Sequence, residues 1–167
     1  VVDGVEMEVP EVGPAYVTDL ALAAALARAA GGGLDGIRHV VANFTPGPHR
    51  RTMVGAWRGV TWIDDSKATN PHAAAASARA YQSVVLIAGG RNKGLDLSPI
   101  ASAPSVRHVV GIGEAAAEFA QLFAPERFTH AASMAEAVAV AGSVAVPGEV
   151  VLLAPGCASF DMFDSYA

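Results

Sequence analysis

Residues 64–71 read Asp-Asp-Ser-Lys-Ala-Thr-Asn-Pro and bring hydroxyl, amide and ammonium groups together in one short segment. Asparagine followed by proline is typical of a helix start, where Asn70 caps the first turn. The N–H groups of that turn and the positive end of the helix dipole favour an anion. Lys67 and the hydroxyls of Ser66 and Thr69 add donors, so the segment predicts a carboxylate or phosphate site. The alternative is that the polar residues only cap the helix, a role that does not call for Lys67.

Residues 89–94, Gly-Gly-Arg-Asn-Lys-Gly, form a second candidate segment. Glycines let the backbone approach a ligand closely, and Arg91 and Lys93 are positive charges for an anion. The pattern is neither a Walker phosphate loop nor the dinucleotide fingerprint GxGxxG. Taken alone, the segment is also compatible with a polar turn whose charges are solvated. A second lysine-bearing loop at the same end of the fold favours a function for both.

Residues 154–161, Ala-Pro-Gly-Cys-Ala-Ser-Phe-Asp, follow the last apolar run and form a third candidate segment. Ser159 can donate a hydrogen bond to an anion there. Cys157 is the single cysteine, which excludes a disulfide framework within the chain. It has no histidine nearby in sequence, so a small buried thiol is favoured over a nucleophile.

A basic turn, His49-Arg50-Arg51, follows a stretch rich in proline and glycine. A basic residue here is suited to reach nucleotide phosphates held by another domain, although a solvated turn is the alternative. The remaining histidines show no metal-ligand spacing. Gly111-Ile112-Gly113 lacks the rest of a dinucleotide fingerprint and predicts a tight strand-to-helix turn.

Apolar runs that alternate with helical patterns must position these loops. We expect strands over residues 1–9, 52–57, 60–63, 83–88, 106–112, 128–131 and 150–153. We expect helices over residues 16–30, 34–44, 71–81, 114–123 and 134–141. Alternating strands and helices predict a Rossmann-like α/β fold whose mostly parallel sheet has an antiparallel edge hairpin through Arg58-Gly59. The three candidate loops then lie at the carboxyl ends of strands, where such sheets bind ligands.

The segment Thr45-Pro46-Gly47-Pro48 is incompatible with helix and predicts a boundary between residues 1–45 and residues 46–167. The 52% hydrophobic content supports a buried core, and the net charge of −5 argues against nucleic acid as the main partner. No apolar run reaches the roughly 20 residues of a membrane helix, so we expect no membrane insertion. We expect a cytoplasmic protein, and the first residue, Val1, leads us to expect a piece of a longer chain.

Together these loops resemble the Mur ligases, the ATP-dependent amino-acid ligases of peptidoglycan synthesis, over nearly the whole chain. The matching segments are Gly47-Pro48-His49-Arg50, Asp64 to Pro71, Gly89-Gly90 with Lys93-Gly94, and Leu152 to Pro155 with Ala158 to Asp161. The DSKATN segment is the most specific and points to the members that add D-glutamate. The resemblance implies that residues 1–45 are the helical end of the central ATP-binding domain. Residues 46–167 would then be most of the C-terminal, amino-acid-binding domain.

The resemblance implies ATP, UDP-N-acetylmuramoyl-L-alanine and D-glutamate as partners, with Mg²⁺ as a cofactor of the full enzyme. The substrate-binding residues it implies for D-glutamate are Lys67, Thr69, Lys93, Ser159 and Tyr166. The nucleotide-binding residues it implies are Arg50 and Asp65, with Asp19 as a candidate where the family often has asparagine. No catalytic residue and no metal ligand is expected within the chain.

The Walker loop, the magnesium-binding cluster and the lysine suited to carbamylation are absent from the sequence, and the family places them upstream of Val1. We therefore expect the chain alone to be inactive, and the full-length protein to be a monomer that uses the missing N-terminal and central domains. Three alternatives remain: another Mur-type or folylpolyglutamate-type amino-acid ligase, a nucleotide-dependent oxidoreductase, and a non-catalytic Rossmann-like binding module. An upstream GxxxxGK[ST] motif separates the ligases from the other two classes.

Overall fold

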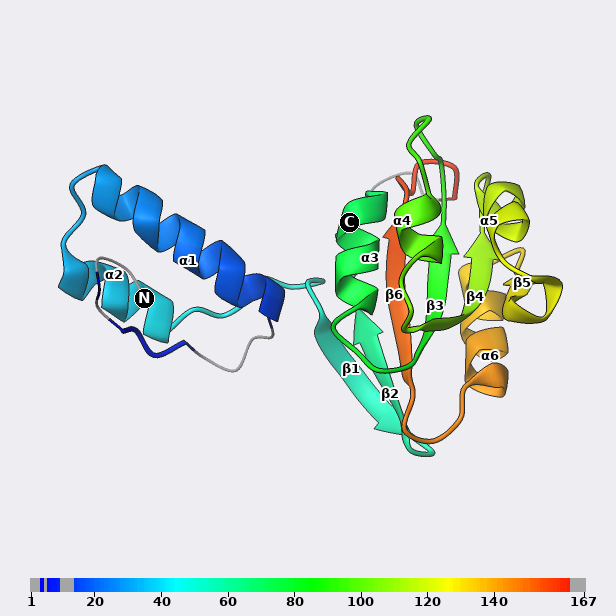
Figure 1. Cartoon of the computed structure of the whole chain (residues 1–167). Helices are drawn as coiled ribbons and strands as arrows, with labels where there is room; N and C mark the ends of the chain where they lie inside the picture. The colour runs from blue at the N-terminus through cyan, green and yellow to red at the C-terminus, as the bar shows by residue number, and fades with distance from the viewer. Residues whose placement is uncertain (1–3, 5, 10–13, 163–167) are drawn as a thin grey trace. The chain divides into compact units, whose positions relative to one another are not determined.

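The computed structural model describes residue 4, residues 6–9 and residues 14–162 (Figure 1). The chain divides into two compact units, Val1–Gly47 and Pro48–Ala167. The division falls inside the stretch of prolines and glycine that the sequence marks as a boundary. None of the described helices combines the length and the apolar character that a membrane crossing requires.

The first unit is built from helices α1 (Pro14–Ala29) and α2 (Leu34–Ala42). Ala24 from α1 and Ile37 and Val41 from α2 form its small buried core, and Met7 packs against them. The strand expected over residues 1–9 is wrong where the structure describes it, because residues 6–9 form no strand. A strand needs a hydrogen-bonded neighbour, and the alternating apolar residues instead bring Met7 onto the helices.

The second unit contains a six-stranded sheet in the order β1-β2-β6-β3-β4-β5. Its strands are β1 (Thr52–Trp57), β2 (Val60–Asp64), β3 (Val84–Gly89), β4 (Val106–Ile112), β5 (Phe128–His130) and β6 (Val150–Gly156). β1 and β2 pair antiparallel as a hairpin, and every other pair is parallel. The mixed α/β fold with an antiparallel edge is therefore confirmed.

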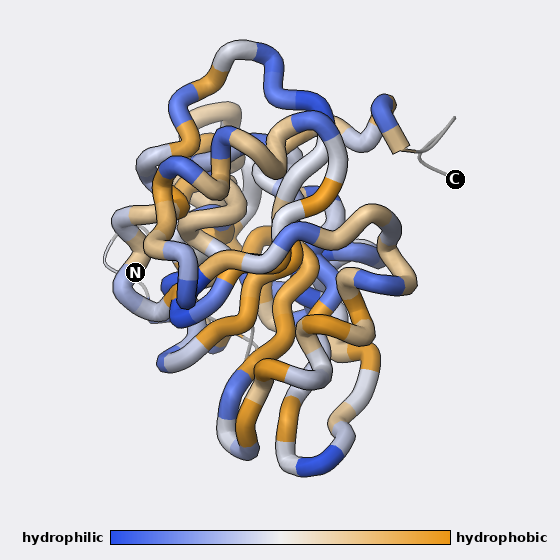
Figure 2. The backbone as a smooth tube through the Cα atoms, turned by 90° about the vertical axis from the view of Figure 1, so that its right-hand side faces the viewer, coloured by the Kyte–Doolittle hydropathy of each residue, from blue (hydrophilic) through white to orange (hydrophobic). Residues whose placement is uncertain are grey.

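Helices cover both faces of the sheet. Helices α3 (Pro71–Ala78), α4 (Ser98–Ala101) and α5 (Ala116–Leu122) share one core with alternate residues of β3, while α6 (Met134–Val144) packs on the other face. Successive residues of β3 enter opposite cores: Leu86 lies in the first and Ile87 in the second. In Figure 2 the apolar colour runs along these strands, and hydrophilic segments gather in the loops at their ends.

The sequence missed two short elements, α4 and the 3₁₀ helix Pro125–Arg127. Both contain proline at their first positions, and a single turn is too short to show a helical period. β6 also continues through Pro155 to Gly156, where the sequence predicts a loop. Proline removes a ladder donor, but the Gly156 N–H still bonds the Ala68 carbonyl oxygen at 2.8 Å.

Candidate functional site

The carboxyl ends of β2, β3, β4 and β6 lie at one edge of the sheet, the upper edge in Figure 1. The chain contains two lysines, Lys67 and Lys93, and both lie in loops that leave this edge. Lys67 and Thr69 come from the loop after β2, and Ser159 from the loop after β6. The topology thus brings the described residues expected to bind an amino acid to the same edge, in three loops.

The loop after β2 is held from two sides. The Asp65 N–H donates to the Leu153 carbonyl oxygen of β6 at 2.8 Å, and the Ala68 carbonyl accepts from Gly156. Lys67 and Thr69 are exposed, whereas Ala68 between them is buried. The loop is therefore anchored through its backbone and Ala68, while the two donor side chains reach the surface.

Asn70 caps α3: its side-chain oxygen accepts the Ala73 N–H at 2.9 Å. The capping alternative is correct for Asn70. It does not account for Lys67, which lies before the cap and exposes its side chain. The N-terminal turn of α3 thus begins beside the lysine, as an anion site requires.

The turn His49–Arg51 binds the same loop. The His49 Nδ1 lies 2.7 Å from Asp64 Oδ2, and the Lys67 N–H donates to the His49 carbonyl oxygen at 3.3 Å. The Arg51 N–H donates to Asp65 Oδ1 at 3.2 Å. Asp65 is buried, so its carboxylate holds this turn while Arg50 between the two contacts is exposed. The turn that contains Arg50 therefore lies beside the loop that contains Asp65 and Lys67.

Sequence reasoning missed the strain in this turn. His49 and Arg51 have φ of 61° and 51°, a left-handed backbone conformation that residues other than glycine rarely adopt. Burial raises the pKa of Asp64, but hydrogen bonds from His49 and from the Ser66 N–H outweigh it and lower the pKa below its usual value. A charged Asp64 therefore helps to hold the strained backbone at His49, while Asp65 accepts the N–H of the strained Arg51.

The loop after β3 is held by Asn92, whose side chain accepts the Leu95 N–H at 3.0 Å and donates to Glu118 at 2.7 Å. Arg91 forms an ion pair with Glu114, its Nη2 lying 2.8 Å from Oε1. Lys93 lies with its Nζ 5.9 Å from the centre of the Phe160 ring. Of the two cations in this loop, Arg91 is engaged by a carboxylate, and Lys93 lies beside the loop that contains Ser159.

The loop after β6 is joined to the loop after β3 by two hydrogen bonds between Arg91 and Ala158, at 2.7 and 3.2 Å. Ser159 is half-buried next to this bridge. Cys157 is 2% exposed, and burial raises the pKa of its thiol to about 12. This confirms the buried-thiol interpretation, because a thiol that stays protonated is a poor nucleophile.

Two predicted residues are not among those that the sheet of the second unit positions at this edge. Asp19 is exposed on α1, in the first unit. Tyr166 lies outside the described residues. Within the described ranges, no group of three or more His, Cys, Asp or Glu side chains could hold a metal ion, so we assign no metal ligand to them.

A groove of about 1120 Å³ lies between α6 and the β1–β2 hairpin, and Asp64 is among the residues that line it. Its lining is mostly apolar and includes Trp62, Val138 and Leu153. Such a surface does not suit a dianionic amino acid, and we do not include it in the candidate site.

Residues 49–157 match the family described as "Mur ligase, glutamate ligase domain". The chain belongs to the Mur ligase family. It is 46% identical over 160 residues to the UDP-N-acetylmuramoylalanine–D-glutamate ligase of Frankia casuarinae, covering 92% of this chain and 34% of that protein. It is 39% identical over 199 residues to the protein of the same name from Mycobacterium tuberculosis, covering 95% of this chain and 40% of the relative. The chain thus spans about a third to two fifths of these relatives.

Solved structures share the fold at low identity. The pseudomurein peptide ligase type C of Methanothermus fervidus has a TM-score of 0.74 at 15% identity, over 92% of this chain and 36% of that one. MurF from Acinetobacter baumannii has a TM-score of 0.68 at 20% identity, over 95% of this chain and 37% of that one. The first is a ligase by name, and the likeness of the two structures establishes the fold of the chain.

Proposed function

We propose that this chain supplies the D-glutamate site of an ATP-dependent ligase that joins D-glutamate to UDP-N-acetylmuramoyl-L-alanine in peptidoglycan synthesis. The observation that carries the proposal is the position of the two lysines of the chain in loops at one sheet edge, with Thr69 and Ser159 on loops of that same edge. Relatives at 39–46% identity that are named for D-glutamate ligation support the choice of amino acid.

The chemistry of the edge suits this substrate. D-Glutamate carries two carboxylates, which call for cations and hydroxyl donors. Lys67, Thr69, Lys93 and Ser159 provide both kinds of group, and Tyr166 would lie near the side chain of the amino acid. The charges of the two lysines attract the substrate but do not remove a proton from it. Their role is therefore to position the amine and not to act as a base.

In the reaction we propose for the full-length protein, the carboxylate of UDP-N-acetylmuramoyl-L-alanine attacks the γ-phosphorus of ATP, and ADP leaves. The D-glutamate amine then attacks the acyl carbon, and the tetrahedral intermediate releases phosphate and a proton to give the amide. Arg50, held between two strained residues, would contact the nucleotide with Asp65, and Asp19 would do so from the first unit. The Mg²⁺ that accompanies ATP has no ligand assigned among the described residues.

Lys67→Ala in the full-length protein tests the proposal. A charge-assisted contact is worth about 1.5–3 kcal/mol, so the KM for D-glutamate should rise about tenfold or more. The KM for ATP should stay within about twofold. Steady-state ligation with each substrate varied in turn measures both constants.

Arg58→Ala is the matched control, because Arg58 is an exposed cation at the hairpin turn, away from the carboxyl edge. It should leave both KM values unchanged. An equal rise of both constants in Lys67→Ala would contradict the assignment. Ligation of other amino acids in preference to D-glutamate would contradict the substrate.

A further inference from the structure

The loops that leave β3, β4 and β6 meet around one carboxylate, that of Asp161. Asp161 Oδ2 accepts the N–H of Glu114, which follows β4, at 2.8 Å. Its other oxygen, Oδ1, is buried and accepts no hydrogen bond from the described residues. Asp161 therefore joins the end of the β6 loop to the start of the β4 loop through a single hydrogen bond.

Two glycines leave room for this carboxylate. Gly113 has φ +63°, and a Cβ there would lie 2.2 Å from Asp161 Oδ2. Gly90 has φ +110°, and a Cβ there would lie 2.3 Å from the Ala158 carbonyl oxygen and 3.5 Å from Asp161 Oδ1. Only glycine combines these conformations with such close approach. The glycines at the ends of β3 and β4 thus accommodate the β6 loop.

Backbone hydrogen bonds complete the junction, by which we mean the place where the loops after β3, β4 and β6 meet around Asp161. The Ala115 N–H donates to the Gly90 carbonyl oxygen at 2.8 Å, and Arg91 and Ala158 bond to each other in both directions. The Met162 N–H donates to the Ser159 carbonyl oxygen at 3.1 Å. Ser159 thus lies between the Ala158 bridge and the Asp161 contact, and both of its flanks are fixed to neighbouring loops.

We propose that Asp161 is a positioning residue that fixes Ser159, and Lys93 beside it, for the carboxylates of the incoming amino acid. This inference rests on the proposed function. An anion would be repelled by the Asp161 charge, so direct contact with a substrate carboxylate is unfavourable. The hydrogen bond to Glu114 gives the residue its role, and that same Glu114 pairs with Arg91. One residue after β4 therefore organises both neighbouring loops.

The test compares Asp161→Ala with Asp161→Asn in the full-length protein. Alanine removes the acceptor, so the KM for D-glutamate should rise about tenfold while the KM for ATP stays within about twofold. Asparagine keeps an acceptor oxygen, so its KM for D-glutamate should stay within about threefold of wild type. Steady-state ligation measures these constants.

Hydrogen exchange provides a readout that does not depend on activity. The Glu114 amide should exchange at least about tenfold faster in Asp161→Ala and at the wild-type rate in Asp161→Asn. Asp96→Ala is the matched control, because Asp96 also accepts a backbone N–H, that of Ser98 at 2.9 Å, but lies outside the junction. It should change neither the exchange at Glu114 nor the KM for D-glutamate.

The outcomes separate the two proposals. If the wild-type protein does not ligate D-glutamate, the proposed function fails, and hydrogen exchange alone decides whether Asp161 holds the junction. If it does ligate D-glutamate, an unchanged KM in Asp161→Ala overturns the positioning role. If Asp161→Ala does not fold, Asp161→Asn decides: near-wild-type KM and exchange support the role. A tenfold rise in its KM with unchanged exchange would overturn the role, since the charge itself would then matter.

Discussion

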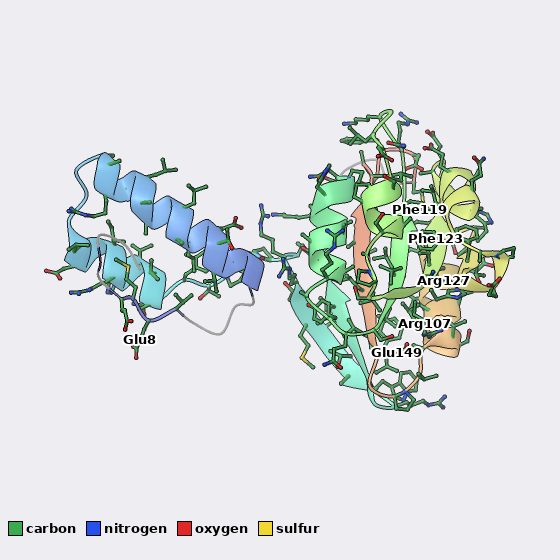
Figure 3. All side chains as sticks on the ribbon, in the orientation of Figure 1. Glu8, Arg107, Phe119, Phe123, Arg127 and Glu149 are labelled. Atoms are coloured by element: carbon green, nitrogen blue, oxygen red, sulfur yellow. The ribbon has the colours of Figure 1, made fainter. Side chains whose placement is uncertain are left out.

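The charged residues differ between the two edges of the sheet in the second unit. We call these the carboxyl edge, where the parallel strands end, and the amino edge, where they begin. At the amino edge, Glu149 is 5% exposed and accepts hydrogen bonds from Ser83 Oγ at 2.7 Å, the Val146 N–H at 2.9 Å and the Arg107 guanidinium (Figure 3). At the carboxyl edge, Lys67, Thr69 and Lys93 expose their side chains on loops that are tied down through their backbones.

This difference separates structural from binding charges. A buried carboxylate whose partners all come from the protein holds elements together. Exposed cations on well-anchored loops contribute little to stability, and a ligand can reach them from the solvent. We therefore expect substitution of the buried charge at the amino edge to change the free energy of unfolding, and substitution of the exposed charges at the carboxyl edge to change the KM for D-glutamate.

The largest effect should come from Glu149→Gln. The Arg107 hydrogen bond, helped by Ser83, lowers the pKa of Glu149 to about 2 against the opposing effect of burial. Replacing this charged acceptor should cost about 3 kcal/mol of unfolding free energy near pH 7, because a hydrogen bond to a charged group is worth about 1.5–3 kcal/mol. Because the folded pKa lies below the ordinary value of 4.5, the stabilisation is present above about pH 4.5. It is lost as the pH falls towards 2.

Denaturant unfolding between pH 2 and 7, followed by tryptophan fluorescence, measures this effect. Both tryptophans, Trp57 and Trp62, lie in the β1–β2 hairpin, so the signal reports the second unit. Glu149→Gln should remove part of the loss of unfolding free energy that the wild type shows as the pH falls. Glu126→Gln, at an exposed position, is the control and should keep it. A KM for D-glutamate that rises in Glu149→Gln would break the contrast between the edges.

Much of the fold was predictable because the second unit follows simple periodic patterns. β1 and β4 occur over the residues expected, and Asn70-Pro71 marks the start of α3. Such signals are local: apolar runs, a two-residue turn and a helix cap. The short α4 and the extension of β6 depend on packing and pairing, which no local pattern records. The strand expected over residues 1–9 failed for the same reason, since alternation does not supply a pairing partner.

The site was predictable only in part. The types and spacing of Lys67, Lys93 and Ser159 mark three loops, and parallel topology places them at one edge. The hydrogen bond between Asp161 and Glu114 joins residues 47 positions apart, and nothing in either local pattern indicates it. Likewise, the turn containing His49 has no glycine at its strained positions, so its left-handed backbone could not be expected. The assignment of D-glutamate contacts to individual residues stays a prediction.

A smaller effect should follow from Gly113→Ala, with Gly94→Ala as its matched control. Both glycines have positive φ, +63° and +75°, so alanine should cost about 1 kcal/mol at either position through backbone strain. At Gly113 the new Cβ would also lie 2.2 Å from Asp161 Oδ2, whereas at Gly94 nothing lies within 4 Å. We expect Gly113→Ala to destabilise by about 2 kcal/mol in total, because the added Cβ crowds its neighbours.

The fluorescence-monitored unfolding described above measures both glycine variants. Gly113→Ala should also raise the KM for D-glutamate, since Asp161 must move, while Gly94→Ala should leave the junction intact. Equal losses of stability at the two positions would mean that Asp161 and its neighbours move away from the added Cβ with no further loss of unfolding free energy. The carboxyl edge would then be looser than its hydrogen bonds indicate.

The smallest effect should come from Phe160→Leu. Phe160 is 62% exposed, so its removal should hardly change stability, but its ring lies under Lys93 Nζ. An exposed cation–π contact is worth about 0.5–1 kcal/mol, which predicts a two- to fivefold rise, roughly, in the KM for D-glutamate. Trp57→Leu removes a similar contact, with Arg58 at 5.2 Å, from the hairpin and should leave this KM unchanged. If both variants behaved alike, the ring would not orient Lys93, and the lysine would reach the substrate from solvent without help from the β6 loop.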